Sequence, residues 1–139
     1  MHYTEIINIE AVFKALGMKP DALKNAEVAF IKLAKLLPPK LREKYIKRKL
    51  AEFVVDIITL AINGDWEADW TNTAQTRLSI WWFIKANKDK KYGFGLSYLD
   101  YANTYTVTFV GARHVFENIE KLKHAAQYFS EYYEDYYFQ

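Results

Sequence analysis

The hydrophobic period of this sequence changes once, shortly after Gly64, and that change limits the folds available to the chain. Before it, apolar residues recur every three or four positions, which is the spacing of a helix with one buried face. One such stripe consists of Leu23, Ala26, Phe30, Leu33 and Leu37. After residue 76 the apolar residues alternate with others, which is the spacing of a half-buried strand. The sequence therefore predicts a helical half followed by a sheet.

Residues 1–64 are expected to form three helices. The first is predicted at Ile9–Leu16, because Asn8 can cap its start and Gly17 can end it. The second opens with Pro20 in its first turn and ends before Pro38, since a proline cannot continue the helical hydrogen-bond ladder.

The third predicted helix, about Lys40–Ile62, is apolar on most sides in its second half, so we expect that half at the centre of the fold. Its first half carries the basic run Lys40, Arg42, Lys44, Lys47, Arg48 and Lys49. This run is either a solvated helix face or a contact surface for phosphate or an acidic partner. The net charge of +2 and a pI near 8.6 fall short of the profile of a dedicated nucleic-acid binder.

The second half is predicted to form an antiparallel meander of three or four strands. The predicted strands are Arg77–Lys85, Tyr92–Leu99 and Thr104–Val110, with Arg113–Phe116 as a short fourth. Asn118 then caps a closing helix with the apolar stripe Ile119, Leu122, Ala126, Phe129, Tyr133 and Tyr136. The expected fold is therefore α+β, one domain over residues 1–139, with residues 1–64 helical and the last helix packed on one sheet face.

The second face of the predicted sheet carries Trp81 and Phe83 opposite small residues. These rings either lie over the strand glycines Gly93 and Gly95 or form a stacking platform for unpaired bases. In the second case, cations near the strand ends and on the third helix would contact phosphates. The candidate nucleic-acid-binding residues are Trp81, Phe83, Lys88, Lys90, Lys91, Lys44, Lys47 and Arg48.

Aromatic side chains are spread around all sides of the last predicted helix. In the whole chain, aromatic residues make up 17% of the sequence. One helix cannot bury rings on every side against one sheet, and tyrosine is enriched at binding hot spots. We therefore expect a non-catalytic protein that binds a protein partner or itself, with nucleic-acid binding as the alternative. The candidate interaction residues are Tyr128, Tyr132, Tyr133, Tyr136, Tyr137 and Phe138.

The residues needed for most catalytic and metal chemistry are not arranged for it in this sequence. No cysteine is present, so a thiolate site is excluded, and the pair Glu120 and His124 is short of the usual number of zinc ligands. An enzyme would have to gather Asp69, His114 and Arg113 into one pocket. We expect no enzyme activity, no metal and no cofactor.

The sequence also shows neither a signal-peptide pattern nor an apolar run of membrane-spanning length. The expected location is therefore the cytoplasm, without membrane contact.

Several short motifs occur in the same order as in one known group of proteins. They are ALGMKP at 15–20, GDWEADWTN at 64–72, WWF at 81–83, the aromatic–glycine strand at 92–98, VGARHVF at 110–116 and the aromatic helix at 118–138. Their order resembles an uncharacterised family of small proteins from Bacteroidetes phages and prophages. The resemblance implies an origin in a phage or other mobile element, and therefore a location in the cytoplasm of a host cell or in a virion. It assigns no activity.

The resemblance also singles out six residues, Trp66, Asp69, Trp70, Asn72, Gly111 and Arg113. We expect a structural role for them, in which the tryptophans cover the edge of the core and Asp69 and Asn72 bind backbone amides. Arg113 would pair with Asp69 or stack on a tryptophan.

Overall fold

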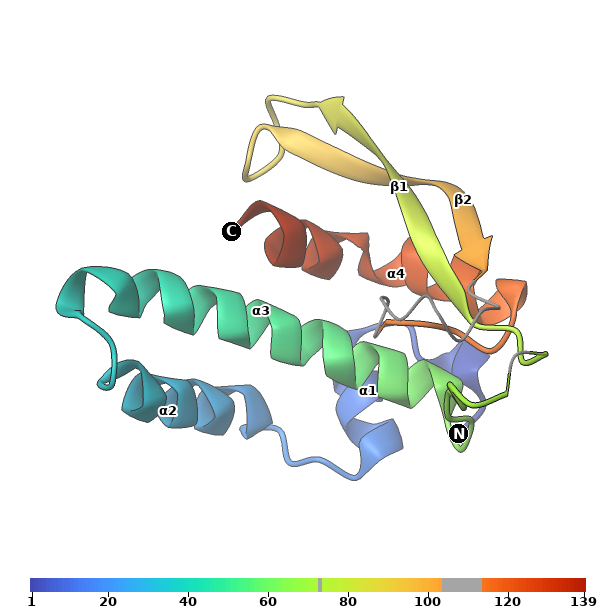
Figure 1. The fold of residues 1–139 in the computed structure, drawn as a ribbon, viewed down its shortest axis with the longest axis horizontal. Helices are drawn as coiled ribbons and strands as arrows, with labels where there is room; N and C mark the ends of the chain where they lie inside the picture. The colour runs from blue at the N-terminus through green and yellow to red at the C-terminus, as the bar shows by residue number, and fades with distance from the viewer. Residues whose placement is uncertain (73, 104–113) are drawn as a thin grey trace.

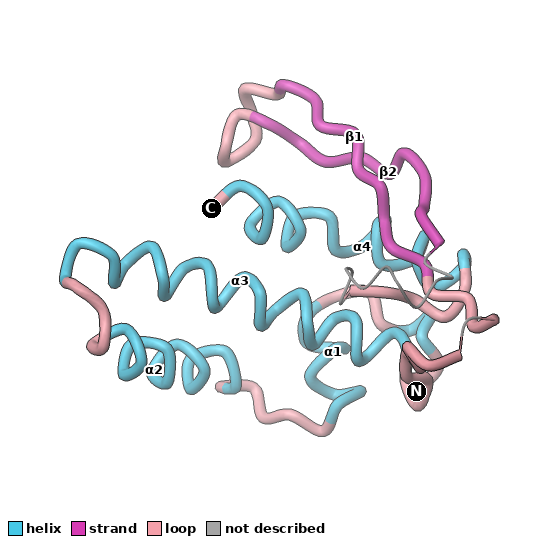
Figure 2. Tube along the Cα trace, in the orientation of Figure 1, coloured by secondary structure: helices cyan, strands magenta, loops and turns pink. Residues whose placement is uncertain are grey.

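The computed structural model describes residues 1–72, 74–103 and 114–139, and these residues form an α+β fold (Figures 1 and 2). In the described residues, four α-helices accompany one two-stranded antiparallel sheet. In chain order the elements are η1 (Tyr3–Glu5), α1 (Ile9–Leu16), α2 (Ala22–Ala34), α3 (Pro39–Asn63), β1 (Leu78–Ala86), β2 (Phe94–Asn103) and α4 (Ile119–Phe138).

The elements are stacked in layers around α3. Figure 1 shows the β1–β2 hairpin above α4, α4 above α3, and α2 below α3. Contacts between residues follow the same order, since α4 packs on both strands and on α3, whereas α1 and α2 pack on α3. The helix that covers the hairpin is thus the one that follows it in the chain, as the sequence predicts.

Capping residues set both ends of α1 and the start of α4. Asn8 accepts a hydrogen bond from the backbone N–H of Ala11 at 2.9 Å, and Asn118 accepts one from Lys121 at 2.9 Å. Gly17 ends α1 at φ +67°, a left-handed conformation that glycine adopts without a Cβ clash. These predicted helix boundaries are confirmed.

The prediction for α2 is wrong in two details. The helix begins at Ala22, two residues after Pro20 instead of around it. Leu33, assigned to the buried stripe, has 48% of its surface exposed, and Ala34 is the residue that is buried. Because α2 packs mainly against one side of α3, only a narrow stripe of this helix is covered.

Most of the second half of α3 is buried, as its composition predicts. Nine residues between Ala51 and Asn63 are buried, although Leu60 is 59% exposed. Asn63 is the last residue of α3, and its buried side-chain amide donates a hydrogen bond to the carbonyl oxygen of Val115 at 2.8 Å. Its oxygen accepts from the N–H of Glu117 at 3.3 Å, so this one side chain ties α3 to the segment before α4.

The described sheet has two strands, fewer than the three or four predicted. The predicted strand Thr104–Val110 lies outside the described residues, and so does Arg113, the first residue of the predicted fourth strand. Among the described residues 114–116 of that strand, Phe116 pairs, in an isolated antiparallel bridge with Leu78. The register between β1 and β2 shifts between Trp81, opposite Asp100, and Trp82, opposite Tyr98. The extra residue therefore belongs to β2.

Both halves of the chain contribute to one hydrophobic core. Ile6 and Val12 come from the N-terminal end, Ile58 from α3, and Phe116 and Phe129 from the C-terminal part. Each is essentially inaccessible to solvent. Residues of both halves of the chain, 1–64 and 65–139, therefore contribute to the same core.

Candidate functional site

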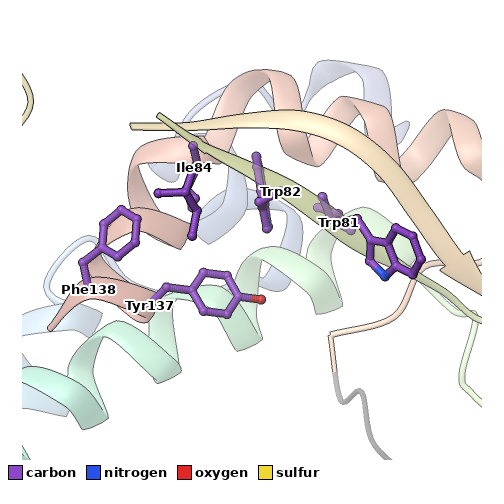
Figure 3. A pocket seen from close by; sticks show the side chains of 7 residues that line it. Trp81, Trp82, Ile84, Tyr137 and Phe138 are labelled. Carbon is purple, nitrogen blue, oxygen red and sulfur yellow. The ribbon is translucent and has the colours of Figure 1, made fainter. Parts of the chain in front are cut away.

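An apolar groove lies between β1 and the end of α4, with a volume of about 560 Å³. We call it the β1–α4 groove, and its lining residues are Ile80, Trp81, Trp82, Ile84, Leu96, Tyr137 and Phe138. Figure 3 shows the three labelled β1 side chains along one side and the two rings of α4 along the other. No lining residue is charged, so the groove suits apolar side chains.

The groove exposes several large apolar side chains to solvent. Trp81 is 54% exposed, Ile84 57% and Tyr137 53%. The alternation of β1 predicts that Ile84 points to the core together with Leu78 and Trp82, and it does point to the same side. The end of α4, however, leaves a gap beneath Ile84, so this residue lines the groove instead of the core.

Two adjacent carboxylates of α4 hold the turn of the hairpin and so fix one end of the groove. Glu134, only 4% exposed, accepts a hydrogen bond from the backbone N–H of Leu96 at 3.0 Å. The same oxygen lies 3.6 Å from the ammonium of Lys90. The buried carboxylate therefore satisfies a strand amide and pairs with a cation at once.

Asp135 adds the second part of this contact. It accepts a hydrogen bond from the Tyr92 hydroxyl at 2.6 Å and lies 3.4 Å from the ammonium of Lys91. Burial, together with the bond to Asp135, raises the pKa of Tyr92, and the Tyr92 and Asp135 oxygens raise the pKa of Lys91. We call these contacts the hairpin clasp, formed by Lys90, Lys91, Tyr92, Glu134, Asp135 and the N–H of Leu96.

The predicted interaction residues of α4 divide between surface and core. Tyr137 and Phe138 line the groove, Tyr128 is 42% exposed, and Tyr132 and Tyr136 are half-buried. Tyr133 is 2% exposed and packs against Trp82 with ring centroids 5.0 Å apart, so it belongs to the core. It faces the hairpin because α4 lies flat against both strands.

The predicted nucleic-acid residues do not form one surface. Trp81 lines the uncharged groove, and Phe83, 50% exposed, is not among the lining residues. Lys40, Lys44 and Lys47 line a separate hollow of about 350 Å³ whose aromatic member is Tyr92. The cations are therefore associated with a different ring from the one that was expected.

Several of these cations also have partners within the chain. Lys90 and Lys91 belong to the hairpin clasp, and Lys47 lies 2.9 Å from Glu43. Arg48 donates to the backbone oxygen of Gln139 at 3.0 Å. The two remaining candidates, Lys44 and Lys88, are exposed.

The loop at 65–76 is organised by an arginine that the sequence did not single out. Arg77 is fully buried, and its Nη1 donates at 2.8 Å to the backbone oxygens of both Asp69 and Asn72. Its guanidinium also lies over the ring of Trp70, 4.8 Å from the centroid. The position carries no local signal, because an arginine before a strand normally faces solvent.

The acidic and amide side chains of the loop bind its backbone, as expected. Asp69 accepts hydrogen bonds from the hydroxyl of Thr71 at 2.6 Å and from its N–H at 3.0 Å, which lowers the pKa of Asp69. Asn72 accepts one from the N–H of Ala74 at 3.0 Å. Gly111 and Arg113 lie outside the described residues, so the contact expected between Arg113 and Asp69 or a tryptophan stays a prediction.

The histidines considered for chemistry have structural partners. His114 Nε2 lies 2.7 Å from a carboxylate oxygen of Asp56 on α3, and not beside Asp69. His124 Nε2 donates to the backbone oxygen of Ile6 at 2.8 Å, so it ties α4 to the N-terminal segment. In the residues that the structure describes, no three histidine or acidic side chains are grouped to hold a metal ion.

None of the described helices has the length and apolarity needed to cross a membrane. Comparisons of the chain with protein-family models, curated proteins and solved structures found no match. The resemblance to the phage-associated family therefore stays a prediction from the sequence.

Proposed function

We propose that this protein is a non-catalytic interaction or assembly protein that binds a protein partner through the β1–α4 groove. The observation that carries the proposal is the exposure of Trp81, Ile84 and Tyr137 around one uncharged hollow. Contiguous exposed apolar surface is characteristic of protein-binding sites, and aromatic anchors in a hollow are typical hot spots.

The construction of the groove supports the same function. Its two walls come from different elements and are held together at one end by the hairpin clasp. A wall fixed in this way is preorganised, so a partner does not have to order it on binding. The lining side chains carry no acid, base or nucleophile other than the tyrosine hydroxyl, which suits binding better than catalysis.

Binding of single-stranded nucleic acid is the less well supported alternative. It requires exposed rings beside unpaired cations, because stacking and phosphate contacts act together. Lys90 and Lys91 are engaged by carboxylates, and the groove that holds Trp81 has no cation in its lining.

A selection from a random peptide library tests the proposed function. We expect the protein to enrich peptides with clustered apolar residues, and Ile84→Lys to weaken their binding about tenfold or more, because it places a charge in the groove. Leu36→Lys is the matched control, because Leu36 is 85% exposed and lies outside the groove lining. Peptide binding that is equal in both variants would contradict the proposal.

The nucleic-acid alternative is tested with the native protein and the variants Lys88→Ala and Lys44→Ala. Tryptophan fluorescence is titrated with a short single-stranded oligonucleotide at low salt. No quenching is expected. Salt-sensitive quenching that Lys88→Ala and Lys44→Ala diminish would favour nucleic-acid binding instead.

A further inference from the structure

The side of α2 that faces away from α3 exposes aliphatic side chains to solvent. Figure 1 shows α2 as the outermost layer on the side of the molecule opposite the hairpin, and α2 packs mainly on α3. Four exposed side chains on α2 and in the turn after it are aliphatic: Val28, Ile31, Leu33 and Leu36. Among the large apolar residues that the structure describes, Leu36 is the most exposed, at 85%. This outer surface is therefore not covered by the rest of the fold.

The turn between α2 and α3 holds Leu36 in its exposed position. The N–H of Leu36 donates to the backbone oxygen of Leu33 at 3.1 Å. From α3, the guanidinium of Arg42 donates to the backbone oxygens on either side of Leu36, those of Leu37 at 3.0 Å and Lys35 at 3.4 Å. The exposure of Leu36 is thus built into the turn, and a binding partner does not have to order this segment.

Cations surround these aliphatic side chains. Residues 32–49 include eight lysines or arginines and one acidic residue, Glu43, which pairs with Lys47 at 2.9 Å. In the described part of the chain, no carboxylate lies within 4 Å of four exposed ammonium groups, those of Lys32, Lys35, Lys40 and Lys44. The whole chain has a net charge of only +2, so the remaining residues are net negative. This asymmetry turns the end of the molecule that holds the α2–α3 turn toward an anionic surface.

The types of side chain on this surface distinguish between kinds of anionic partner. Protein-binding hot spots are enriched in tryptophan, tyrosine and arginine, whereas leucine and valine are under-represented there. Single-stranded nucleic acids stack their bases on aromatic rings, and the exposed apolar side chains of α2 are all aliphatic. Aliphatic side chains among lysines are instead typical of helices that lie in the surface of an anionic bilayer.

We propose that this surface docks on a bilayer that contains anionic lipids, with α2 along the bilayer and Leu36 inserted below the headgroups. We call it the α2 outer face, formed by Val28, Ile31, Lys32, Leu33, Lys35 and Leu36. Its lysines contact lipid phosphates while their stems and the aliphatic side chains reach the acyl boundary. Lys40 and Lys44 at the start of α3 add to the attraction.

The proposal changes one expectation from the sequence. The expectation of no membrane contact rested on the lack of an apolar run of spanning length, and docking at the bilayer surface needs no spanning helix. The α2 outer face also lies on the opposite side of the molecule from the hairpin, whose β1 strand lines the β1–α4 groove (Figure 1). This inference is therefore separate from the proposed function, and both sites can be occupied together.

Flotation of the native protein with lipid vesicles tests the contact. Vesicles of phosphatidylcholine alone are compared with vesicles of equal parts phosphatidylcholine and phosphatidylglycerol. We expect binding to the mixed vesicles to be about tenfold tighter or more and to weaken as salt is added, because salt screens the surface potential. No binding to the mixed vesicles, or equal binding to both kinds, overturns the proposal.

Substitutions of exposed residues test which surface makes the contact. We expect Leu36→Ser to weaken binding to the mixed vesicles about tenfold, because it removes a side chain that the bilayer buries. Lys35→Gln should weaken it about fivefold. Leu60→Ser and Lys88→Gln are the matched controls, since both residues are exposed and lie outside the α2 outer face. Circular dichroism confirms that all four variants fold. Equal binding by Leu36→Ser and Leu60→Ser contradicts docking through α2.

A fluorescent label tests insertion, since the native chain has no cysteine. Leu36→Cys and Leu60→Cys are each labelled with a dye whose emission shifts to the blue in an apolar environment. We expect the mixed vesicles to shift the emission of the label at position 36 and not at position 60. Binding without this shift would mean that only charges are in contact, and insertion of Leu36 would be wrong.

Soluble polyanions and apolar peptides complete the test. Polyglutamate or a short oligonucleotide that binds more tightly than the mixed vesicles, with the same loss in Lys35→Gln, would assign the surface to a soluble partner and overturn the proposal. Leu36→Ser should bind apolar peptides as the native chain does, and Ile84→Lys should keep its binding to vesicles. A failure of membrane docking and a failure of the proposed function are thereby distinguished.

Discussion

At the scale of single residues, Arg77 shows how one buried cation can hold a loop in place. Its guanidinium is surrounded by the backbone oxygens of Asp69 and Asn72 and by the ring of Trp70. Both carbonyl oxygens are bonded by the single nitrogen Nη1, and the planar guanidinium also lies over the Trp70 ring, a stacking contact that the ammonium of lysine does not reproduce. Arg77 therefore ties the backbone at Asp69 and Asn72 to the residue before β1.

We expect Arg77→Ala to lower the free energy of unfolding by about 2–3 kcal/mol, because the part-buried backbone oxygens of Asp69 and Asn72 lose a charged donor. The change in the free energy of unfolding is measured by urea unfolding, with tryptophan fluorescence as the signal. Arg42→Ala is the control, since Arg42 also donates to backbone oxygens but is half-buried, and its loss should cost below about 1 kcal/mol. Equal losses at the two arginines would show that burial of Arg77 is unimportant.

Tyr133 makes the free energy of unfolding depend on pH in the alkaline range. Burial raises its pKa, so above about pH 10 the unfolded chain releases the phenolic proton while the folded chain keeps it. Stability from this group is complete below about pH 10 and falls as the pH rises further. The raised pKa values of Tyr92, Tyr132 and Tyr137 act in the same direction.

We therefore expect Tyr133→Phe to reduce the alkaline loss of stability. Between about pH 8 and pH 11, the free energy of unfolding of the native chain should fall by about 1 kcal/mol more than that of the variant. At neutral pH the two should agree within about 1 kcal/mol, because the Tyr133 hydroxyl has no hydrogen-bond partner in the described part of the chain. Parallel pH profiles would refute this assignment.

At the scale of elements, the hairpin clasp joins β2 to α4 through one buried carboxylate. Glu134→Ala should cost about 1–3 kcal/mol, since it leaves the N–H of Leu96 without an acceptor in a buried position. Glu134→Gln keeps an oxygen and should cost less. Amide hydrogen exchange gives the local readout, with faster exchange at Leu96 expected in the alanine variant only. Unchanged exchange at Leu96 in Glu134→Ala would mean that the bond does not protect the amide.

The types of α1, α4 and β1 were predictable, because each of these elements carries a local signal. Caps at Asn8 and Asn118, the glycine at position 17 and the period of two in β1 each act within a few residues. Contacts such as Asn63 with Val115 or Glu134 with Leu96 join residues 52 and 38 positions apart, and no local pattern specifies them. For the same reason, the sequence pointed to Trp81, Tyr137 and Phe138 separately but not to the groove that brings them together.

At the scale of the whole molecule, the shared core should make the chain unfold as one unit. All four tryptophans lie between residues 66 and 82, whereas three of the four described helices precede them. Fluorescence and far-ultraviolet circular dichroism thus report largely on different halves. We expect their urea transitions to coincide.

Ile58→Ala should shift both transitions together, with a loss of about 2–5 kcal/mol, because Ile58 lies fully buried in the middle of the core. Leu60→Ala, two residues further along the same helix and 59% exposed, is the control and should change stability little. Transitions that separate in Ile58→Ala would mean that residues 1–64 and 65–139 fold independently.

The covering of the hairpin by α4 has a consequence for synthesis on the ribosome. Because α4 follows both strands in the chain, Trp82 and Leu96 leave the exit tunnel before the helix that shields them has been made. Nascent segments with exposed apolar strands are prone to aggregation and bind chaperones. The interval between translation of β2 and of α4 is therefore the stage at which the growing chain most needs protection.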